Sequence, residues 1–212
     1  MLGQFRSFFK PFFGLLATPF IWLKINPNLV SLFALPFAGY AAFAYSTGQY
    51  APALIGLLLA SVWDGVDGTV ARVQGKQTLW GNYFETMIDK LVEILLFLGL
   101  AIMHPLAGVA ALGFSLWSSY AKPRVALVII TDNRDWPAIG EHADKLVLLF
   151  LATLLSVVFP SFSFQIIEYG LWAIAFVSFI GTLQRMGYAR NLIRIAEKEG
   201  TVLPYLKAGK ER

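Results

Sequence analysis

The chain has 212 residues, of which 57% are apolar and only 14% are charged, whereas soluble domains carry about a quarter charged residues. This composition argues against an ordinary soluble domain and indicates a membrane protein. The absence of cysteine excludes disulfides and cysteine-based metal sites, and we attribute the net charge of +4 to cationic loops that set membrane orientation, so no nucleic-acid partner is expected.

The first predicted element covers residues 1–25. Basic residues alternate there with phenylalanine, leucine and tryptophan, and Pro11 and Pro19 interrupt the apolar runs. Such a segment is typical of a helix that lies at the lipid headgroups rather than crossing the bilayer. It lacks the pattern of a cleavable signal peptide.

Six apolar segments follow, each near the length of about 20 residues that a membrane span requires. The predicted fold is therefore an all-α integral membrane protein with six transmembrane helices, preceded by an N-terminal interfacial amphipathic helix. We expect the interfacial helix at 1–25, a six-helix transmembrane domain at 26–195 and a basic cytoplasmic tail at 196–212. The predicted spans are residues 28–46, 51–72, 80–103, 107–130, 143–159 and 165–189.

The distribution of basic residues predicts the orientation. The turns at residues 46–50, 104–105 and 160–165 carry no lysine or arginine, whereas the alternate turns and both termini do. Cytoplasmic loops are enriched in these two residues. We therefore expect a multi-pass protein of the cell membrane, with both termini and the basic turns in the cytoplasm.

Four of the acids within residues 63–93 form two pairs. Asp64 and Asp67 are three residues apart, and Glu85 and Asp89 are four apart. Each pair therefore shares one face of its helix. A short turn joins the two helices, so antiparallel packing would bring all four carboxylates together near the cytoplasmic end.

Such a cluster needs compensation, because one charged group near the bilayer centre costs about 2.5–3.5 kcal/mol. Divalent cations provide it, and oxygen ligands favour Mg²⁺, Mn²⁺ or Ca²⁺ over zinc. Two ions could clamp a diphosphate, and a carboxylate free of metal could act as a general base. Two other interpretations stay open: structural ion pairs with Arg72, Lys76 and Lys90, or a cation or proton path in a transporter.

The same stretch resembles the signature of the CDP-alcohol phosphotransferases. That signature reads Asp, two residues, Asp-Gly, two residues, Ala-Arg, eight residues, Gly, three residues, Asp, three residues, Asp. Every spacing is present here, with glutamate in place of the third aspartate. The matching positions are Asp64, Asp67, Gly68, Ala71, Arg72, Gly81, Glu85 and Asp89, and a similar Pro-Asn-x-x-Ser element opens the first span at Pro27, Asn28 and Ser31.

The resemblance implies a transferase of phospholipid biosynthesis, with a catalytic transmembrane domain. It would move a substituted phosphate from a CDP-linked donor, CDP-diacylglycerol or CDP-archaeol, to an alcohol and release CMP. Two Mg²⁺ or Mn²⁺ ions would be bound by Asp64, Asp67, Glu85 and Asp89, and Asp89 would also be the catalytic base. The CDP group would contact Asn28, Ser31, Asp64, Gly68, Ala71, Arg72 and Gly81. Members of this family form homodimers, so a homodimer is expected.

Glu85 is the one departure from the signature. Its side chain is one methylene longer than that of aspartate, but its carboxylate can still bind oxygen-seeking metals. We therefore expect activity to be retained, with a shifted carboxylate.

Basic residues at the end of the fourth span and in the two spans that follow it indicate the acceptor. Lys122 and Arg124 form a Tyr-x-Lys-x-Arg element similar to that of members that use inositol phosphate, and Lys145 and Arg185 are further candidates. Together they could form an anion pocket, although cations at span ends are also expected simply as orientation residues. The preferred acceptor is therefore a polyol phosphate such as inositol phosphate, with glycerol phosphate or serine as alternatives.

The glycine-containing signature argues against the transporter interpretation, because a transporter needs acids but no nucleotide-fitting pattern.

Overall fold

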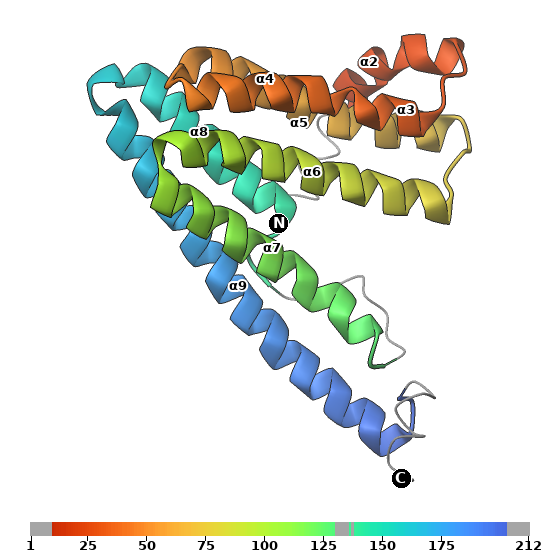
Figure 1. Cartoon of the computed structure of the whole chain (residues 1–212). Coiled ribbons are helices and arrows are strands. Elements are labelled where there is room, and N and C mark those ends of the chain that lie inside the picture. Colours follow the sequence, from red (N-terminus) through yellow and green to blue (C-terminus); the bar gives the residue numbers. More distant parts are fainter. Residues whose placement is uncertain (1–9, 130–135, 137, 203–212) are drawn as a thin grey trace. The chain divides into compact units, whose positions relative to one another are not determined.

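A computed structural model describes residues 10–129, 136 and 138–202 of the chain. Over this part the protein is all-α, as predicted, and its only β-type pairing is an isolated bridge between Ile129 and Val202. The helices shown in Figure 1 are, in chain order, α2 (Lys10–Trp22), α3 (Pro27–Leu32), α4 (Ala34–Ser46), α5 (Tyr50–Val73), α6 (Leu79–Met103), α7 (Pro105–Ala126), α8 (His142–Val158), the 3₁₀ helix η1 (Pro160–Phe162) and α9 (Ser163–Glu199).

Three helical segments of the described part are long and apolar enough to cross a membrane: Pro27–Ser46, Tyr50–Val73 and Pro160–Glu199. They coincide with the first, second and sixth predicted spans. The other three predicted segments are helical as well, but α6 carries several charged residues and α8 has only 17 residues. The apolar helices therefore indicate a membrane protein, and six transmembrane helices stay a prediction.

Helix α9 extends beyond the predicted span. It runs past residue 189 to Glu199, into the segment assigned to the tail. Gly200 then ends the helix with a φ of 70°, and the Thr201 amide donates back to the Ala196 carbonyl at 3.0 Å, which is a common glycine-terminated helix end. The helix continues because residues 190–199 contain good helix formers and no proline or glycine. Residues 1–9 of the predicted interfacial segment and 203–212 of the predicted tail lie outside the described residues.

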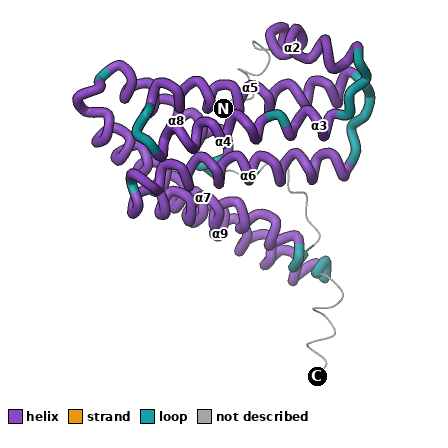
Figure 2. Tube along the Cα trace, turned by 45° about the horizontal axis from the view of Figure 1, so that its top comes forward, coloured by secondary structure: helices purple, strands orange, loops and turns teal. Residues whose placement is uncertain are grey.

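The helices form two compact units, residues 1–109 with 150–168 and residues 110–149 with 169–212. In the first unit α4 packs against both α5 and α6, as Figure 2 also shows. Glycine permits this close packing: a Cβ atom on Gly99 would lie 2.3 Å from the Ala42 carbonyl oxygen, and one on Gly56 would lie 2.9 Å from the Ala41 amide nitrogen. Small residues of this kind let helix backbones approach each other closely.

Three polar contacts, two of them buried, also hold the first unit. The hydroxyls of Tyr45 and Thr153 are 2.6 Å apart. The His104 ring has Nδ1 2.7 Å from the Glu168 carboxylate and Nε2 3.3 Å from the Tyr50 hydroxyl. Because buried polar groups are costly without partners, these pairs fix which residues of α4, α5, α6, α8 and α9 meet.

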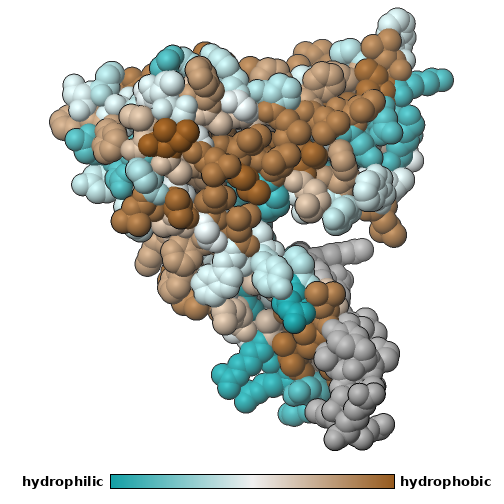
Figure 3. Space-filling model, viewed as in Figure 1, coloured by the Kyte–Doolittle hydropathy of each residue, from teal (hydrophilic) through white to brown (hydrophobic). Residues whose placement is uncertain are grey.

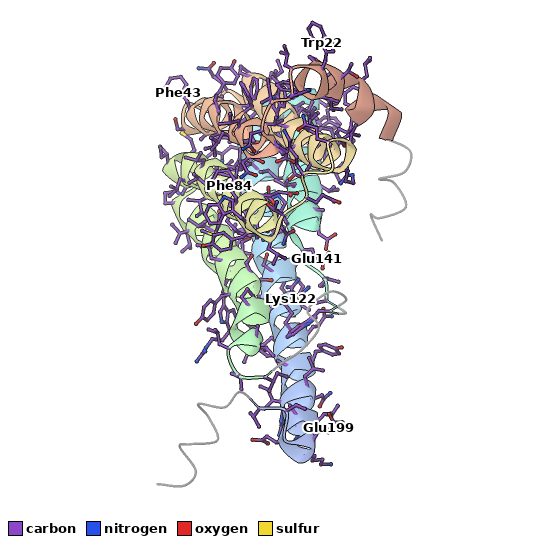
Figure 4. All side chains as sticks on the ribbon, turned by 90° about the vertical axis from the view of Figure 1, so that its right-hand side faces the viewer. Trp22, Phe43, Phe84, Lys122, Glu141 and Glu199 are labelled. Atoms are coloured by element: carbon purple, nitrogen blue, oxygen red, sulfur yellow. The ribbon has the colours of Figure 1, made fainter. Side chains whose placement is uncertain are left out.

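Helix α2 packs on α5 through a small apolar cluster that includes Ala17, Val66 and Val70. Its other side exposes large apolar side chains, and Trp22 projects from the helix end in Figure 4, with 82% of its surface exposed. Apolar residues also gather over α4 and α6 on the face shown in Figure 3. Exposed apolar surface of this extent suits contact with lipid, and the interfacial role of α2 stays a prediction.

The contact between α4 and α6 predicts that alanine substitution at two glycines has very different effects on stability. Replacing Gly99 with alanine forces the helices apart, because the new Cβ would overlap backbone atoms of Ala42. We expect Gly99→Ala to lower the free energy of unfolding by about 1–3 kcal/mol. The matched control is Gly39→Ala on α4, where an added Cβ meets no atom within 4 Å. Thermal unfolding in detergent measures both, and equal midpoints for the two variants would contradict the packing argument.

Candidate functional site

The turn between α5 and α6 sets the position of the acids. Helix α5 ends where Gly75 adopts a φ of 62°, and the Lys76 amide donates back to the Ala71 carbonyl at 3.0 Å. Helix α6 begins at once, because the Thr78 hydroxyl caps it by accepting from the Gly81 amide at 2.9 Å. This tight reversal places the end of α5 beside the start of α6.

The structure brings the four predicted acids together. One carboxylate oxygen from each of Asp64, Asp67 and Glu85 can be chosen so that all three lie within 4.8 Å of one another. The carboxyl group of Asp89, one turn further along α6, contacts that of Asp64 and interacts electrostatically with Glu85 and Asp67. Glu85 therefore reaches the group despite its extra methylene. We call these four residues the acid group.

Asp67 is the most buried member of the acid group, with 3% of its surface exposed. Its carboxylate accepts hydrogen bonds from the Gly68 amide and from the hydroxyl of Ser31 on α3. Ser31 is itself buried, and its hydroxyl lies 3.4 Å from the Pro27 carbonyl oxygen. Two donors thus orient one carboxylate, as is usual for residues that bind metals.

The cations that could have neutralised the acid group have other partners. Arg72 donates to the Thr69 hydroxyl at 3.0 Å. Lys76 reaches a backbone carbonyl at 3.4 Å, and Lys90 binds Glu93 at 2.6 Å. None of these three contacts joins a cation to the acid group. A compact set of oxygen ligands fits hard divalent cations such as Mg²⁺ and Mn²⁺.

A cavity of about 230 Å³ opens beside the acid group, between α3, α5, α6 and the turn that joins the last two. Two of the acids, Asp67 and Glu85, form part of its wall, whereas Asp64 does not. All the other residues predicted to contact the nucleotide line it, namely Asn28, Ser31, Gly68, Ala71, Arg72 and Gly81.

Gly81 keeps this cavity open. A Cβ atom there would lie 3.1 Å from the Thr78 hydroxyl and 3.5 Å from the Asn28 side-chain oxygen. Any larger side chain would fill the space between α3 and α6. The requirement for glycine at this position of the signature therefore has a steric explanation in this chain.

The cavity wall also contains residues that sequence reasoning did not assign to the nucleotide: Pro27, Lys76, Gln77, Thr78 and Asn82. Most of them belong to the turn or to the first turn of α6. The sequence marks Thr78 as a helix N-cap, because it is a threonine that stands just before an apolar helix. Nothing in the sequence pattern marks Gln77 or Asn82, because only the reversal of the chain turns them toward the cavity.

The four candidate acceptor residues belong to the second unit. Lys145 and Arg185 are buried, with 1% and 6% of their surfaces exposed, whereas Lys122 is partly buried and Arg124 exposed at the end of α7. The structure therefore gives the four cations unequal settings, and their joint role as an anion pocket stays a prediction.

Arg185 has the best-defined surroundings of the four. Its guanidinium donates to the Ser118 hydroxyl and, at 3.4 Å, to the Ile139 carbonyl. Glu141 and Asp144 attract it electrostatically. A guanidinium that is held this firmly presents its remaining donors in a fixed direction.

Comparison with known proteins gives the same family as the sequence motif. The sequence model of CDP-alcohol phosphatidyltransferase matches residues 24–180. Archaetidylinositol phosphate synthase from Pyrococcus horikoshii is 24% identical over 179 residues, which cover 82% of this chain and 88% of the relative. The enzyme of that name from Methanothermobacter thermautotrophicus is 26% identical over 196 residues, which cover 89% and 93%.

Solved structures share the fold. The crystal structure of Mycobacterium tuberculosis phosphatidylinositol phosphate synthase with CDP-DAG bound matches with a TM-score of 0.71 and 20% identity, covering 84% of this chain and 92% of the other. The same enzyme in complex with manganese and citrate matches with a TM-score of 0.70 and 19% identity, covering 82% and 87%.

The hydrogen bond from Ser31 to Asp67 yields a test of the site. Ser31→Ala leaves the buried carboxylate with one donor fewer, so we expect Mn²⁺ binding to weaken by about tenfold. Electron paramagnetic resonance of unbound Mn²⁺ measures the affinity of the purified protein. The control is Ser61→Ala, which removes a hydroxyl of α5 that bonds only to the Leu57 carbonyl. If both variants bind Mn²⁺ like the unmodified protein, Ser31 does not orient a metal ligand.

Proposed function

The chain belongs to the CDP-alcohol phosphatidyltransferase family and is a phosphotransferase, and we propose that it makes a phospholipid from a CDP-linked lipid and a polyol phosphate. The donor is CDP-diacylglycerol or CDP-archaeol, the acceptor is inositol phosphate, and CMP is the leaving group. The reaction takes place at the cytoplasmic face of the cell membrane in a homodimer.

One observation carries this proposal: a single cavity has the nucleotide signature on its wall and two members of the acid group at its edge. A nucleoside diphosphate in such a cavity would have its phosphates beside the acids. Carboxylates repel phosphates unless cations lie between them. The arrangement thus supports a metal-dependent reaction on a diphosphate.

The residues fit divalent cations by the chemistry of their donors. Asp64, Asp67 and Glu85 would bind the ions, with Asp89 close to one of them. When bound, Mg²⁺ or Mn²⁺ neutralises the charge of the diphosphate and of the departing CMP. Manganese in the similar mycobacterial enzyme supports this assignment.

Asp89 is the proposed general base. Its carboxyl accepts the proton from the acceptor hydroxyl while that oxygen forms a bond to the lipid-side phosphorus. The bond from this phosphorus to the oxygen bridging the diphosphate breaks, and CMP leaves with the electron pair. Arg72, on the cavity wall, stabilises the negative charge on the diphosphate, and the glycines hold the backbone close to the nucleotide.

Inositol phosphate is the acceptor that the relatives support best, because two of them are named archaetidylinositol phosphate synthases. Lys122, Arg124, Lys145 and Arg185 would bind its phosphate. Glycerol phosphate and serine are the alternative acceptors. A cation or proton transporter is not favoured, because transport of a cation or proton would not require a cavity lined by the nucleotide signature.

We predict that Asp89→Asn slows the reaction by about 10²–10⁴-fold, which is the usual effect of losing a general base. The assay is CMP release from CDP-diacylglycerol and from CDP-archaeol with Mg²⁺ or Mn²⁺, run with inositol phosphate, glycerol phosphate and serine in parallel. Full activity of Asp89→Asn would show that Asp89 is not the general base. No CMP release with any pair of substrates would refute the proposed reaction.

A matched control for this assay is Glu199→Gln. Glu199 is an exposed acid at the end of α9 and is labelled in Figure 4. The substitution makes the same chemical change, from carboxylate to amide, outside the acid group. It should retain full CMP release and metal dependence.

The acceptor residues give a separate prediction. Arg185→Gln and Lys122→Gln should raise the KM for a phosphorylated acceptor by about tenfold or more, since a charge-assisted hydrogen bond to phosphate is lost. The KM for the CDP-linked donor should stay unchanged. Steady-state kinetics with each acceptor separates the two constants, and equal KM values in variant and unmodified enzyme would exclude these residues from the acceptor site.

A further inference from the structure

Helix α6 carries a third acid that the proposed reaction does not use. Glu93 lies one helical turn beyond Asp89 and two beyond Glu85, so the three acids share one face of the helix. Only 1% of its surface is exposed. A buried carboxylate is costly unless it is paired, so its presence here needs a reason.

Glu93 forms an ion pair with Lys90. Their Nζ and Oε2 atoms are 2.6 Å apart, and 21% of the lysine side chain is exposed. Lys90 is the only lysine or arginine of α6, and it directly follows Asp89 in the sequence. Its flexible four-carbon chain allows the ammonium to take several positions around this turn of the helix.

An ammonium ion beside the acid group would be attracted to it. Attraction between opposite charges is several times stronger in a partly buried site than in water. A lysine bound there would occupy carboxylate oxygens and add a positive charge beside them. Both effects would oppose the binding of divalent cations at Asp64, Asp67 and Glu85.

We propose that Glu93 is a positioning residue that binds Lys90 and thereby keeps this ammonium away from the acid group. The contact leaves the carboxylate oxygens of Asp64, Asp67 and Glu85 available to divalent cations. Glu93 can hold the lysine because it is buried and one turn removed from the acids. This inference rests on the metal-binding role proposed above for the acid group.

The test is Mn²⁺ binding to the purified full chain without substrates, measured by electron paramagnetic resonance of unbound Mn²⁺. Glu93→Gln releases the ammonium, so the dissociation constant for Mn²⁺ should rise by about tenfold, as one uncompensated charge near the site would cause. In Lys90→Met/Glu93→Gln no ammonium remains, and Mn²⁺ should bind at least as tightly as in the unmodified protein. This recovery separates positioning from a merely structural role.

A second carboxylate contact, with a buried histidine, provides the control. Glu168→Gln removes one partner of His104, which ends α6 15 residues after Asp89, or about 22 Å along the helix. This variant should lower the thermal midpoint without changing the affinity for Mn²⁺. It shows what the loss of a carboxylate contact does when no lysine is released near the acid group.

The outcomes are distinct. If Glu93→Gln binds Mn²⁺ as tightly as the unmodified protein, or if the double variant binds as weakly as Glu93→Gln, the inference is wrong. If Glu93→Gln does not fold, Glu93→Asp shortens the reach to Lys90 while keeping the charge; weaker Mn²⁺ binding supports the inference and unchanged binding overturns it. Failure of the unmodified protein to bind Mn²⁺ would instead refute the proposed function.

Discussion

The mutual repulsion of four carboxylates is the constraint on which the rest of this structure depends. Asp64, Asp67, Glu85 and Asp89 meet where α5 and α6 come together, in a protein that exposes many large apolar side chains. Such a group is unstable without compensation. The chain provides hydrogen bonds to Asp67 from Ser31 and from a backbone amide. We propose that divalent cations provide the larger part of the compensation, which would suit the site to chemistry on a diphosphate.

The surrounding helices are built to hold these acids in place. Helix α4 packs closely on α5 and α6 because glycine and alanine meet at the contacts. The turn after α5 reverses the chain at Gly75, and Thr78 caps the next helix. Rigid packing would matter for the proposed metal site, because metal ligands must keep their geometry to within a fraction of an ångström. The acids therefore stand on helices rather than on loops.

Donor and acceptor recognition are supported by observations of different kinds. The cavity proposed for the nucleotide is formed by neighbouring helices of one unit, and its wall contains six residues of the family signature. The cations proposed for the acceptor belong to the second unit, where Arg185 donates to Ser118 and to the Ile139 carbonyl. The names of the relatives, rather than these contacts, favour inositol phosphate. Family and reaction class thus follow from the signature, and acceptor choice depends on cations that many membrane proteins place at helix ends.

The sequence by itself determined the helical class, the places of the helices and the acid group, because apolar length and the spacing of charges are local properties. It also identified the residues that line the cavity from α3 and from the signature. Only the tertiary structure decided that Gln77 and Asn82 lie in that cavity wall and that Lys90 binds Glu93 rather than the acid group. It also decided that Ser31 reaches Asp67. These facts depend on how the chain reverses after α5 and on where flexible side chains find their partners, and neither is encoded in a local pattern.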